Sequence, residues 1–388
     1  MGEIRTFLKD VLIVSLGAYG GPEAHYGVFA KQMVDKRGYI SEDELYEYMA
    51  MTSVLPGPSS TQTLMAIGYH VGGMKLALLT LLVWALPIGL FLSGAVFLYA
   101  RGQLSDQLLT SLDSLAYVAI GFVFYAAFRM LKKGWKTPTL WGLGLISFWV
   151  TLFVQATWIF PFVLIGSGVL YSALNRSEKT ARVSLIPLLN GPLIVIFSAA
   201  VIGSFIATVY GPSTWQFIGH FFQFGFLVIG GGQVVIPYMI QTMVTDFAWM
   251  SLPDFLIGLG LVQGLPGPMF SFAAWAGGLS SASLGIHSGW ASLMGLIGLF
   301  LPGALLILIM LPLWPTLKVY SFIKPALSGV IAAAGGLVLS TGVRLFLDTE
   351  IQLLSTGLIV LTLGLLVSQK IPAPLIVLGS FLGYFIIL

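Results

Sequence analysis

Apolar residues run along this chain in long blocks, separated by short polar or Gly- and Pro-rich segments. An apolar helix of about 20 residues crosses a hydrocarbon core of about 30 Å. Nine blocks are near that length, at approximately 74–100, 112–131, 138–154, 158–174, 183–208, 289–313, 325–346, 351–368 and 372–388. The pattern predicts an all-α polytopic membrane protein.

Four further apolar stretches are each interrupted by Gly and Pro. Stretch 7–36 is broken at Gly20-Gly21-Pro22, and stretch 44–70 at Leu55-Pro56-Gly57-Pro58. Stretch 215–243 is broken at Gly230-Gly231-Gly232, and stretch 254–280 at Leu265-Pro266-Gly267-Pro268. Two halves of about 13 residues joined at such a break are typical of re-entrant hairpins, in which a broken helix enters the membrane halfway and returns.

The breaks recur at a fixed spacing. Pro56 and Pro266 are 210 positions apart, and Gly20 and Gly230 have the same separation. Pro87 and Pro302 are 215 positions apart, which predicts a five-residue insertion near 280–285. We therefore divide the chain into an N-terminal repeat (1–182), a linking transmembrane helix (183–214) and a C-terminal repeat (215–388). Each repeat has two broken hairpins and about four transmembrane helices.

Loop charges indicate that the two repeats have opposite orientations. Lys31, Lys36 and Arg37 follow the first break, and basic residues near span ends mark the cytoplasmic side. The equivalent loop of the second repeat has Asp246 and Asp254 and no basic residue. Two inverted-topology repeats with broken helices are the architecture of many secondary transporters, whose binding sites form where half-helix ends meet.

Composition removes most other classes of protein. Hydrophobic residues make up 57% of the 388 residues and charged residues only 9%, against about 25% in a soluble domain. The net charge of +3 and the short basic clusters give no support for nucleic-acid binding. Cysteine is absent and the four His are scattered, so we predict no metal site and no cofactor. We interpret the N-terminus as mature protein, because no small-residue cleavage site follows its apolar run.

The breaks also predict where an anion would bind. A helix N-terminus presents unpaired N–H groups and a partial positive charge, and Pro suits its first turn. Hydroxyl and amide donors follow the first Pro-Gly-Pro, whereas the second is followed by Met269, Phe270, Ser271 and Phe272. We predict an asymmetric site weighted to the first repeat, formed by Gly21, His25, Gly57, Pro58, Ser59, Ser60, Thr61, Gln62, Gly231, Gly232, Gly267 and Ser271. The alternative is that Pro-Gly-Pro only kinks a helix whose hydroxyls bond back to preceding carbonyls.

Glu23 and His25 form a titratable pair beside the first break. An ionisable residue at membrane depth is a functional candidate by default. Glu23 is a candidate proton carrier, and His25 is a candidate for either proton transfer or anion contact. The alternative is that Glu23 caps its helix and His25 packs at the interface.

These residues carry a family resemblance. The segments GGPEAH (20–25), KQMVDKRGYI (31–40), SEDEL (41–45) and LPGPSSTQTLMAIGYHVGG (55–73), with the paired breaks, resemble the chromate ion transporter family in its long-chain form, where two homologous halves are fused. The resemblance implies a prokaryotic, multi-pass inner-membrane protein that exports chromate, a tetrahedral dianion similar to sulfate, under the proton-motive force, and so confers chromate resistance. The family's motif positions correspond to Gly20, Gly21, Pro22, His25, Lys36, Arg37, Pro56, Gly57, Pro58, Gln62, Gly230, Gly231, Gly232, Pro266, Gly267 and Pro268.

The sequence leaves two other functions open. A passive anion channel can use the same inverted repeats and helix-end sites. An intramembrane enzyme using His25 and Glu23 is less favoured, because no nucleophile or metal triad accompanies them. The partners that we expect are a chromate- or sulfate-like oxyanion and the lipid bilayer, and the Gly-rich spans also permit a homodimer.

Overall fold

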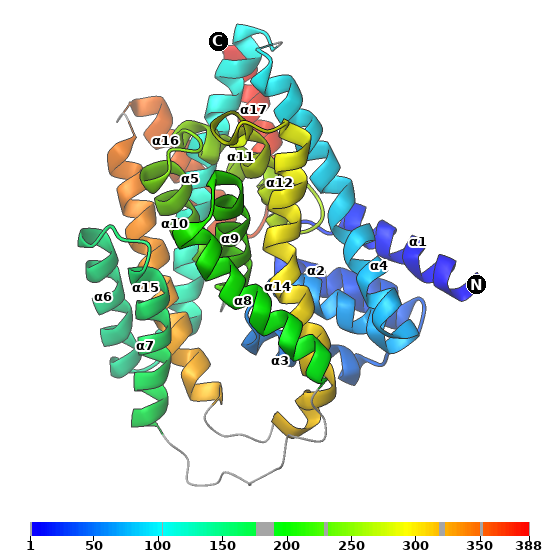
Figure 1. Ribbon diagram of the computed structural model, residues 1–388. Helices are drawn as coiled ribbons and strands as arrows, with labels where there is room; N and C mark the ends of the chain where they lie inside the picture. The colour runs from blue at the N-terminus through cyan, green and yellow to red at the C-terminus, as the bar shows by residue number, and fades with distance from the viewer. Residues whose placement is uncertain are drawn as a thin grey trace. The chain divides into compact units, whose positions relative to one another are not determined.

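The computed structural model describes residues 2–102, 104–175, 190–228, 232–317, 323–349 and 352–387. The chain forms two compact units, and each is assembled from segments of both halves (Figure 1). Unit 1 comprises Met1–Gln103, Arg182–Val228 and Leu265–Val319. Unit 2 comprises Leu104–Ala181, Ile229–Gly264 and Tyr320–Leu388.

Unit 1 holds both Pro-Gly-Pro breaks and the helices that follow them. Its helices are α1 (Gly2–Gly17), α2 (Pro22–Phe29), the π-helix η1 (Ala30–Asp35), α3 (Glu42–Val54), α4 (Ser59–Ala100), α8 (Gly191–Tyr210), α9 (Ser213–Phe226), the 3₁₀ turn η5 (Met269–Ser271), α12 (Phe272–Leu279), α13 (Ser281–Leu284) and α14 (Ser288–Leu317). α14 packs on α9, α12 and α4, while α1 and α3 pack on α4.

The long helix α4 is two helices joined at a kink. Gly72 and Gly73 leave the helical conformation inside it, and Gly73 has a φ of +69° that a side chain would disfavour. The kink falls between the predicted half-helix ending at 70 and the predicted span beginning at 74. α4 therefore carries the short helix after the first Pro-Gly-Pro and then a full membrane-crossing segment.

Unit 2 is organised around α15 (Ile323–Asp348). The other helices are α5 (Asp106–Gly134), α6 (Pro138–Phe153), α7 (Ile159–Leu174), the 3₁₀ turn η3 (Gly232–Val234), α10 (Val235–Ile240), the π-helix η4 (Gln241–Asp246), α11 (Leu252–Gly264), α16 (Leu353–Ser368) and α17 (Ala373–Ile387). α15 packs closely on α5, α6 and α7. Small residues permit this approach, because Gly336 lies directly against the carbonyl of Gly144.

Within the described ranges, five helices are long and apolar enough to cross a membrane: Ser59–Ala100, Asp106–Gly134, Gly191–Tyr210, Ser288–Pro315 and Lys324–Asp348. Four other predicted spans form helices α6, α7, α16 and α17, which have only 15 or 16 residues each. These are shorter than the roughly 20 residues of an untilted span. The linking helix begins at Gly191, and residues 183–189 of its predicted range lie outside the described residues.

The exposed apolar side chains of α8 indicate what surrounds this helix. Val195, Phe205 and Val209 are more than half exposed on this helix, and Tyr210 at its end is 84% exposed. Water would not support such a contiguous apolar face, whereas lipid acyl chains do. α8 therefore has the apolar outer surface of a membrane-crossing helix.

The predicted repeat extends to backbone hydrogen bonds. The Tyr39 N–H donates to the Met33 carbonyl at 2.9 Å, and 210 positions later the Trp249 N–H donates to the Met243 carbonyl at 2.8 Å. A π-helix precedes both turns, η1 in the N-terminal repeat (the first copy) and η4 in the C-terminal repeat (the second copy). The predicted insertion near 280–285 corresponds to the extra turn α13, which ends at Gly285 with a φ of +65°.

Candidate functional site

The two Pro-Gly-Pro turns exchange hydrogen bonds reciprocally inside unit 1. The Gly57 N–H of the first turn donates to the Val228 carbonyl at 2.7 Å. The Gly267 N–H of the second turn donates to the Ala18 carbonyl at 2.8 Å. Each partner is related to the other by the same 210-residue spacing. Each turn is therefore completed by the opposite copy, as expected for two repeats related by a pseudo-two-fold axis.

Glycine is required in both turns, more strictly in the first. Gly57 has a φ of +119° and Gly267 a φ of +82°, a region that other residues rarely adopt. A Cβ on Gly57 would lie 2.9 Å from the Cα of Gly303, whereas a Cβ on Gly267 would lie 3.1 Å from the Cγ1 of Ile88. The first turn is thus packed directly against the backbone of α14.

Two helix N-termini meet beside the first turn. Pro58 is the N-cap of α4 and Gly21 the N-cap of α2, and in the described structure neither end is capped by a side chain. The first-turn N–H groups of both helices are therefore available to an anion. Gly21, Gly57 and Pro58, which we predicted as part of the anion site, lie at or directly before these helix ends, and their contact with an anion stays a prediction.

His25 joins these two helix ends. Its Nδ1 lies 3.1 Å from the Oγ of Ser60, so the first turn of α2 contacts the first turn of α4. His25 is only 2% exposed and Ser60 only 5%. The Nε2 of His25 is buried and has no hydrogen-bond partner among the described residues. The site therefore contains an imidazole nitrogen able to bond to a ligand.

Trp84 packs behind this pair, and sequence reasoning did not identify it. It is fully buried on α4, and its ring lies 5.3 Å from that of His25 in an edge-on arrangement. Its Nε1 donates to the Oγ1 of Thr61 at 3.0 Å, and its carbonyl accepts from Ser15 at 2.8 Å. The only sequence signal was a Trp inside an apolar span, which is typical of ordinary membrane packing.

The four polar residues after Pro58 have different surroundings. Ser60 and Thr61 are buried beside His25 and Trp84, while Ser59 is half-buried. The Nε2 of Gln62 donates to the Pro56 carbonyl at 2.8 Å and to the Gly303 carbonyl at 3.1 Å. Both amide hydrogens of Gln62 are used in this way, so in this structure its Nε2 holds the turn.

Two other predicted site residues, Ser271 and Gly232, have described positions. Ser271 is buried in unit 1, and its hydroxyl lies 3.4 Å from the Ala85 carbonyl, the residue after Trp84. Gly232 begins η3 in unit 2. Gly231 and the side chain of Glu23 lie outside what the structure describes.

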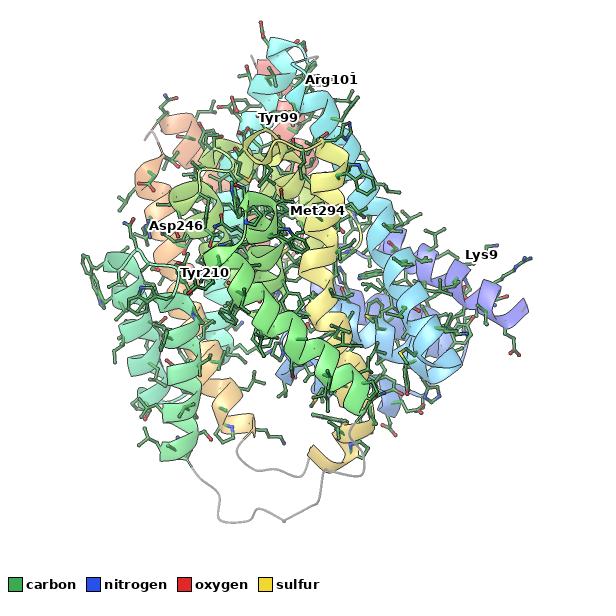
Figure 2. The ribbon with its side chains drawn as sticks, viewed as in Figure 1. Lys9, Tyr99, Arg101, Tyr210, Asp246 and Met294 are labelled. Carbon is green, nitrogen blue, oxygen red and sulfur yellow. The ribbon has the colours of Figure 1, made fainter. Side chains whose placement is uncertain are left out.

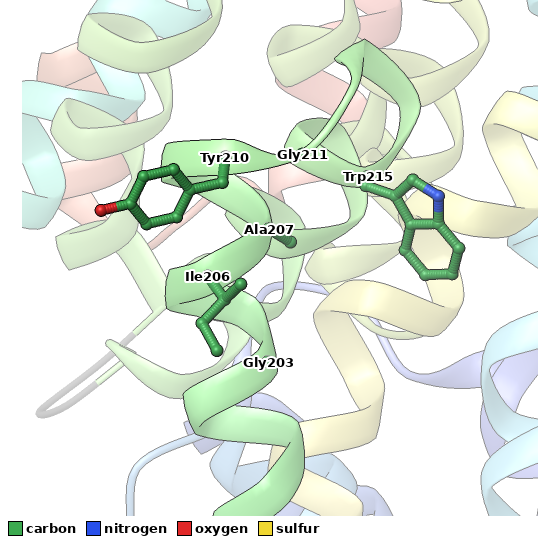
Figure 3. A pocket seen from close by; sticks show the side chains of 6 residues that line it. All are labelled: Gly203, Ile206, Ala207, Tyr210, Gly211 and Trp215. Atoms are coloured by element: carbon green, nitrogen blue, oxygen red, sulfur yellow. The ribbon is translucent and has the colours of Figure 1, made fainter.

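A separate hollow lies where α8 meets α9. Gly203, Ile206, Ala207, Tyr210, Gly211 and Trp215 line it, and Figure 3 shows an aliphatic and aromatic surface. Its walls contain no charged side chain, and Trp215 is 60% exposed. This hollow suits a lipid chain and not an oxyanion.

The fold and the paired turns can now be compared with known proteins. The sequence profile of the family described as "Chromate transporter" matches residues 5–172 and 215–385. The chain belongs to the chromate transporter family. The two matched segments are the two repeats, so this family member has the long, two-domain form.

Named relatives extend over nearly the whole chain. The "Probable chromate transport protein" of Synechococcus elongatus is 26% identical over 372 residues, covering 94% of this chain and 91% of the relative. The "Chromate transport protein" of Cupriavidus metallidurans is 23% identical over 98% of this chain and 92% of its own. That of Pseudomonas aeruginosa is 24% identical over 92% and 84%. No solved structure matches the chain significantly.

The comparisons confirm the resemblance. This member of the chromate transporter family is a multi-pass protein of the cytoplasmic membrane, and its relatives are named as transporters and not as enzymes. Family membership supports transport of chromate.

Proposed function

We propose that the protein is a secondary transporter that exports chromate or a related tetrahedral oxyanion such as sulfate, driven by the proton-motive force. One observation carries the proposal: two uncapped helix N-termini meet at the buried His25 and Ser60. Backbone N–H groups are donors suited to tetrahedral oxygens and need no buried lysine. The bonded pair adds one further donor: His25 Nε2 when the Ser60 hydroxyl donates to Nδ1, or the Ser60 hydroxyl when Nδ1 carries the proton.

The donor set also accounts for the substrate class. Each hydrogen bond to a charged ligand is worth about 1.5–3 kcal/mol, so several bonds are needed to offset the dehydration of a dianion. The first turns of α2 and α4 supply these bonds around Ser60. Sulfate has the same shape and charge as chromate, and it is expected to compete for the site.

We assign proton coupling to the first copy. Glu23 and His25 precede the anion site on α2, while the equivalent positions of the second copy are Gln233 and Val235. The Glu23→Gln variant is expected to lose transport driven by a pH gradient. Unchanged coupling in that variant would remove Glu23 from the mechanism.

The first experiment is flux of radiolabelled chromate into proteoliposomes. It is run with and without a pH gradient and with excess sulfate as competitor. Gradient-driven accumulation that sulfate blocks supports a coupled oxyanion transporter. Flux that stays strictly downhill under every gradient would instead favour a passive anion channel.

The site is tested with a matched pair of serines. Ser60→Ala is expected to lower kcat/KM for chromate about 10- to 100-fold, the value of one charge-assisted hydrogen bond. Ser53→Ala is the control, because Ser53 is exposed and bonds only to the Ala50 carbonyl of its own helix. Equal flux in both variants, with correct insertion, would contradict the donor role of Ser60.

A further inference from the structure

The imidazole of His25 lies among uncharged groups. Its ring contacts Phe29, with centroids 6.3 Å apart, and Trp84, with centroids 5.3 Å apart. Its described polar partner is the Ser60 hydroxyl. A charge on this ring would be buried without a charged partner among these residues, which is costly. The ring is therefore neutral, with one N–H and one bare nitrogen.

The His25–Ser60 pair has two arrangements, and the first only donates to a ligand. In it the Ser60 hydroxyl donates to Nδ1, so the imidazole proton is on Nε2. Nε2 then donates to an oxygen of the ligand, while the Ser60 hydroxyl is already used. A fully deprotonated oxyanion, which has acceptors alone, receives one hydrogen bond from the pair.

The second arrangement both donates and accepts. Nδ1 carries the proton and donates to the Ser60 Oγ, which leaves the Ser60 O–H for a ligand oxygen. The bare Nε2 is buried and has no partner among the described residues, and it can accept only from a ligand that has an O–H. An oxyanion that carries one proton therefore makes two hydrogen bonds to the pair and satisfies Nε2.

The helix ends at the site balance one negative charge. A helix N-terminus is equivalent to about half a positive charge, so the uncapped ends of α2 and α4 together supply about one. A dianion would keep about one negative charge unbalanced in a buried site, which is unfavourable. Charge and hydrogen bonding thus favour the same ligand, an oxyanion with one charge and one proton.

α1, η1 and α4 pack on α2, and the charged groups of α1 are directed elsewhere. The buried Asp10 accepts from Gln32 at 2.7 Å and from Tyr39 at 2.7 Å. It also pairs with Arg37 at 2.8 Å, so its charge is balanced. Lys9 extends away from the helices, as Figure 2 shows.

The titratable groups of the other packed elements are also directed away from His25. On α2, Tyr26 contacts Phe29 through its ring, and the side chain of Glu23 lies outside the described residues. The groups on η1 and on α4 are exposed; they are Lys31, Asp35, His70 and Lys75.

The second copy has neither the pair nor the charges near it. The positions 210 residues after His25 and Ser60 are Val235 and Phe270. Phe247 and Trp249, at the positions equivalent to Arg37 and Tyr39, stack with ring centroids 4.7 Å apart. Recognition of a proton on the ligand is therefore confined to the first copy.

We propose that the substrate is bound as a hydrogen oxyanion with one negative charge, whose O–H donates to His25 Nε2 and whose oxygens accept from Ser60 and the N-termini of α2 and α4. This inference rests on the proposed oxyanion transport and names the form of the anion that the same site takes. Each bound anion brings one proton with it.

The proposal distinguishes chromate from sulfate. Chromate takes up a proton near neutral pH and becomes such an ion, whereas sulfate does so only in strong acid. Sulfate is left with the first arrangement, so it competes only in excess. The two dianions have the same shape, and the site separates them by their basicity.

Binding at several pH values tests the proposal. The purified full-length protein is titrated with radiolabelled chromate, and separately with radiolabelled sulfate, between about pH 6 and pH 8. The Kd of chromate is expected to rise about tenfold from pH 7 to pH 8, as the anion loses its proton, while the Kd of sulfate stays constant. At pH 6 sulfate is expected to bind about 10- to 100-fold more weakly than chromate, the value of one hydrogen bond to a charged ligand.

Sulfate separates the two sources of pH dependence. A proton taken up by the protein, on His25 or Glu23, would strengthen the binding of both anions as the pH falls. A proton taken up by the substrate strengthens the binding of chromate alone. A parallel change for both anions, or a constant Kd for chromate, would overturn the proposal.

A histidine variant tests the acceptor. In His25→Leu, which removes Nε2, the change in chromate Kd from pH 7 to pH 8 is expected to shrink to less than about threefold. The control is His287→Leu, because His287 is exposed and accepts from the Gly289 N–H at 3.1 Å; it should keep the tenfold change. A tenfold change that persists in His25→Leu would contradict the role of Nε2. If His25→Leu does not fold, the comparison of chromate with sulfate on the unaltered protein still decides.

The outcomes separate this inference from the proposed function. Chromate binding that is independent of pH, together with gradient-driven flux, would overturn the inference and retain the function. Binding that follows the proton of chromate, with flux that stays strictly downhill, would retain the inference and replace the transporter by a channel. Absence of chromate binding at every pH would refute both.

Discussion

The two copies share a backbone design and differ in the chemistry that they place on it. Both have a positive-φ glycine in the Pro-Gly-Pro turn, a bond from that glycine to the other copy, and a π-helix before the next turn. The first copy adds His25, Ser60 and the buried Asp10, which is bonded to Gln32, Arg37 and Tyr39. The second copy has Val235, Phe270 and an aromatic stack at the related positions.

This difference separates two requirements of the fold. The turns and their exchanged bonds are needed twice, because each break leaves backbone groups that lipid cannot satisfy. The side chains that donate hydrogen bonds to a ligand are needed in one copy only. The second copy therefore completes the architecture, and the first copy holds the candidate chemistry.

The largest effect is expected at the first turn. Gly57→Ala should destabilise the protein by about 3 kcal/mol, combining the positive φ with a clash against the backbone of Gly303. Gly267→Ala should cost less, because Ile88 is a side chain that can shift. Thermal unfolding of the purified proteins measures both. Equal losses of stability in the two variants would mean that a Cβ is tolerated no better at position 267 than at position 57.

A smaller effect is expected when Trp84 is replaced by the residue at the equivalent position of the second copy. Its counterpart, 215 positions later, is the buried Leu299. Trp84→Leu should cost about 2–3 kcal/mol, because the smaller side chain leaves a cavity beside His25 and removes the donor to Thr61. Unfolding and chromate flux should both fall. Leu299→Ile serves as the conservative control. If Trp84→Leu changes neither stability nor chromate flux, His25 does not depend on packing against the Trp84 ring.

The bonds to the buried Asp10 are expected to stabilise the first copy by an intermediate amount. Tyr39→Phe should lower the free energy of unfolding by about 1.5 kcal/mol, because it removes a hydrogen bond to the buried Asp10 carboxylate. Tyr46→Phe is the matched control: its hydroxyl bonds to Glu42 on an exposed helix face and should contribute almost nothing. Equal unfolding temperatures for Tyr39→Phe and Tyr46→Phe would contradict a stabilising bond between Tyr39 and Asp10.

The smallest effect is expected at the helix caps, where the copies agree. Ser41 and Ser251 both cap a helix after the π-helical turn, with Glu44 and Asp254 as partners. Ser41→Ala and Ser251→Ala should each cost about 1 kcal/mol. If only one of the two variants loses stability, the difference between the two copies includes their helix caps.

The Ser41 cap also has a predicted pH dependence. Bonds from the Ser41 backbone and hydroxyl lower the pKa of Glu44 below its usual value. A carboxylate with a lowered pKa contributes stability that is present above its unfolded pKa and is lost as pH falls through its folded pKa. The penalty of Ser41→Ala should therefore shrink below about pH 4, as thermal unfolding at several pH values would show.

The sequence predicted the breaks and the repeat, because Gly and Pro mark them directly, and its boundary between residues 70 and 74 coincides with the kink of α4. It did not predict that both Pro-Gly-Pro turns lie in one compact unit, since that depends on contacts between residues about 170 or 250 positions apart. It singled out His25 and Ser60 as candidates by their residue types, and their role in binding stays a prediction. It did not predict that the Gln62 amide bonds to the Gly303 carbonyl, 241 positions away. It missed Asp10, whose partners are 22 to 29 residues away.

The exchanged turn bonds impose an order on synthesis. Ala18 is made long before Gly267, so the second turn finds its carbonyl acceptor already present. The first turn must wait for Val228, about 170 residues later, which at roughly 5–20 residues per second is on the order of 10–30 seconds. During that interval the Gly57 N–H has no native acceptor. The first break therefore keeps an unpaired backbone donor until the chain has been made as far as Val228, beyond the end of α9.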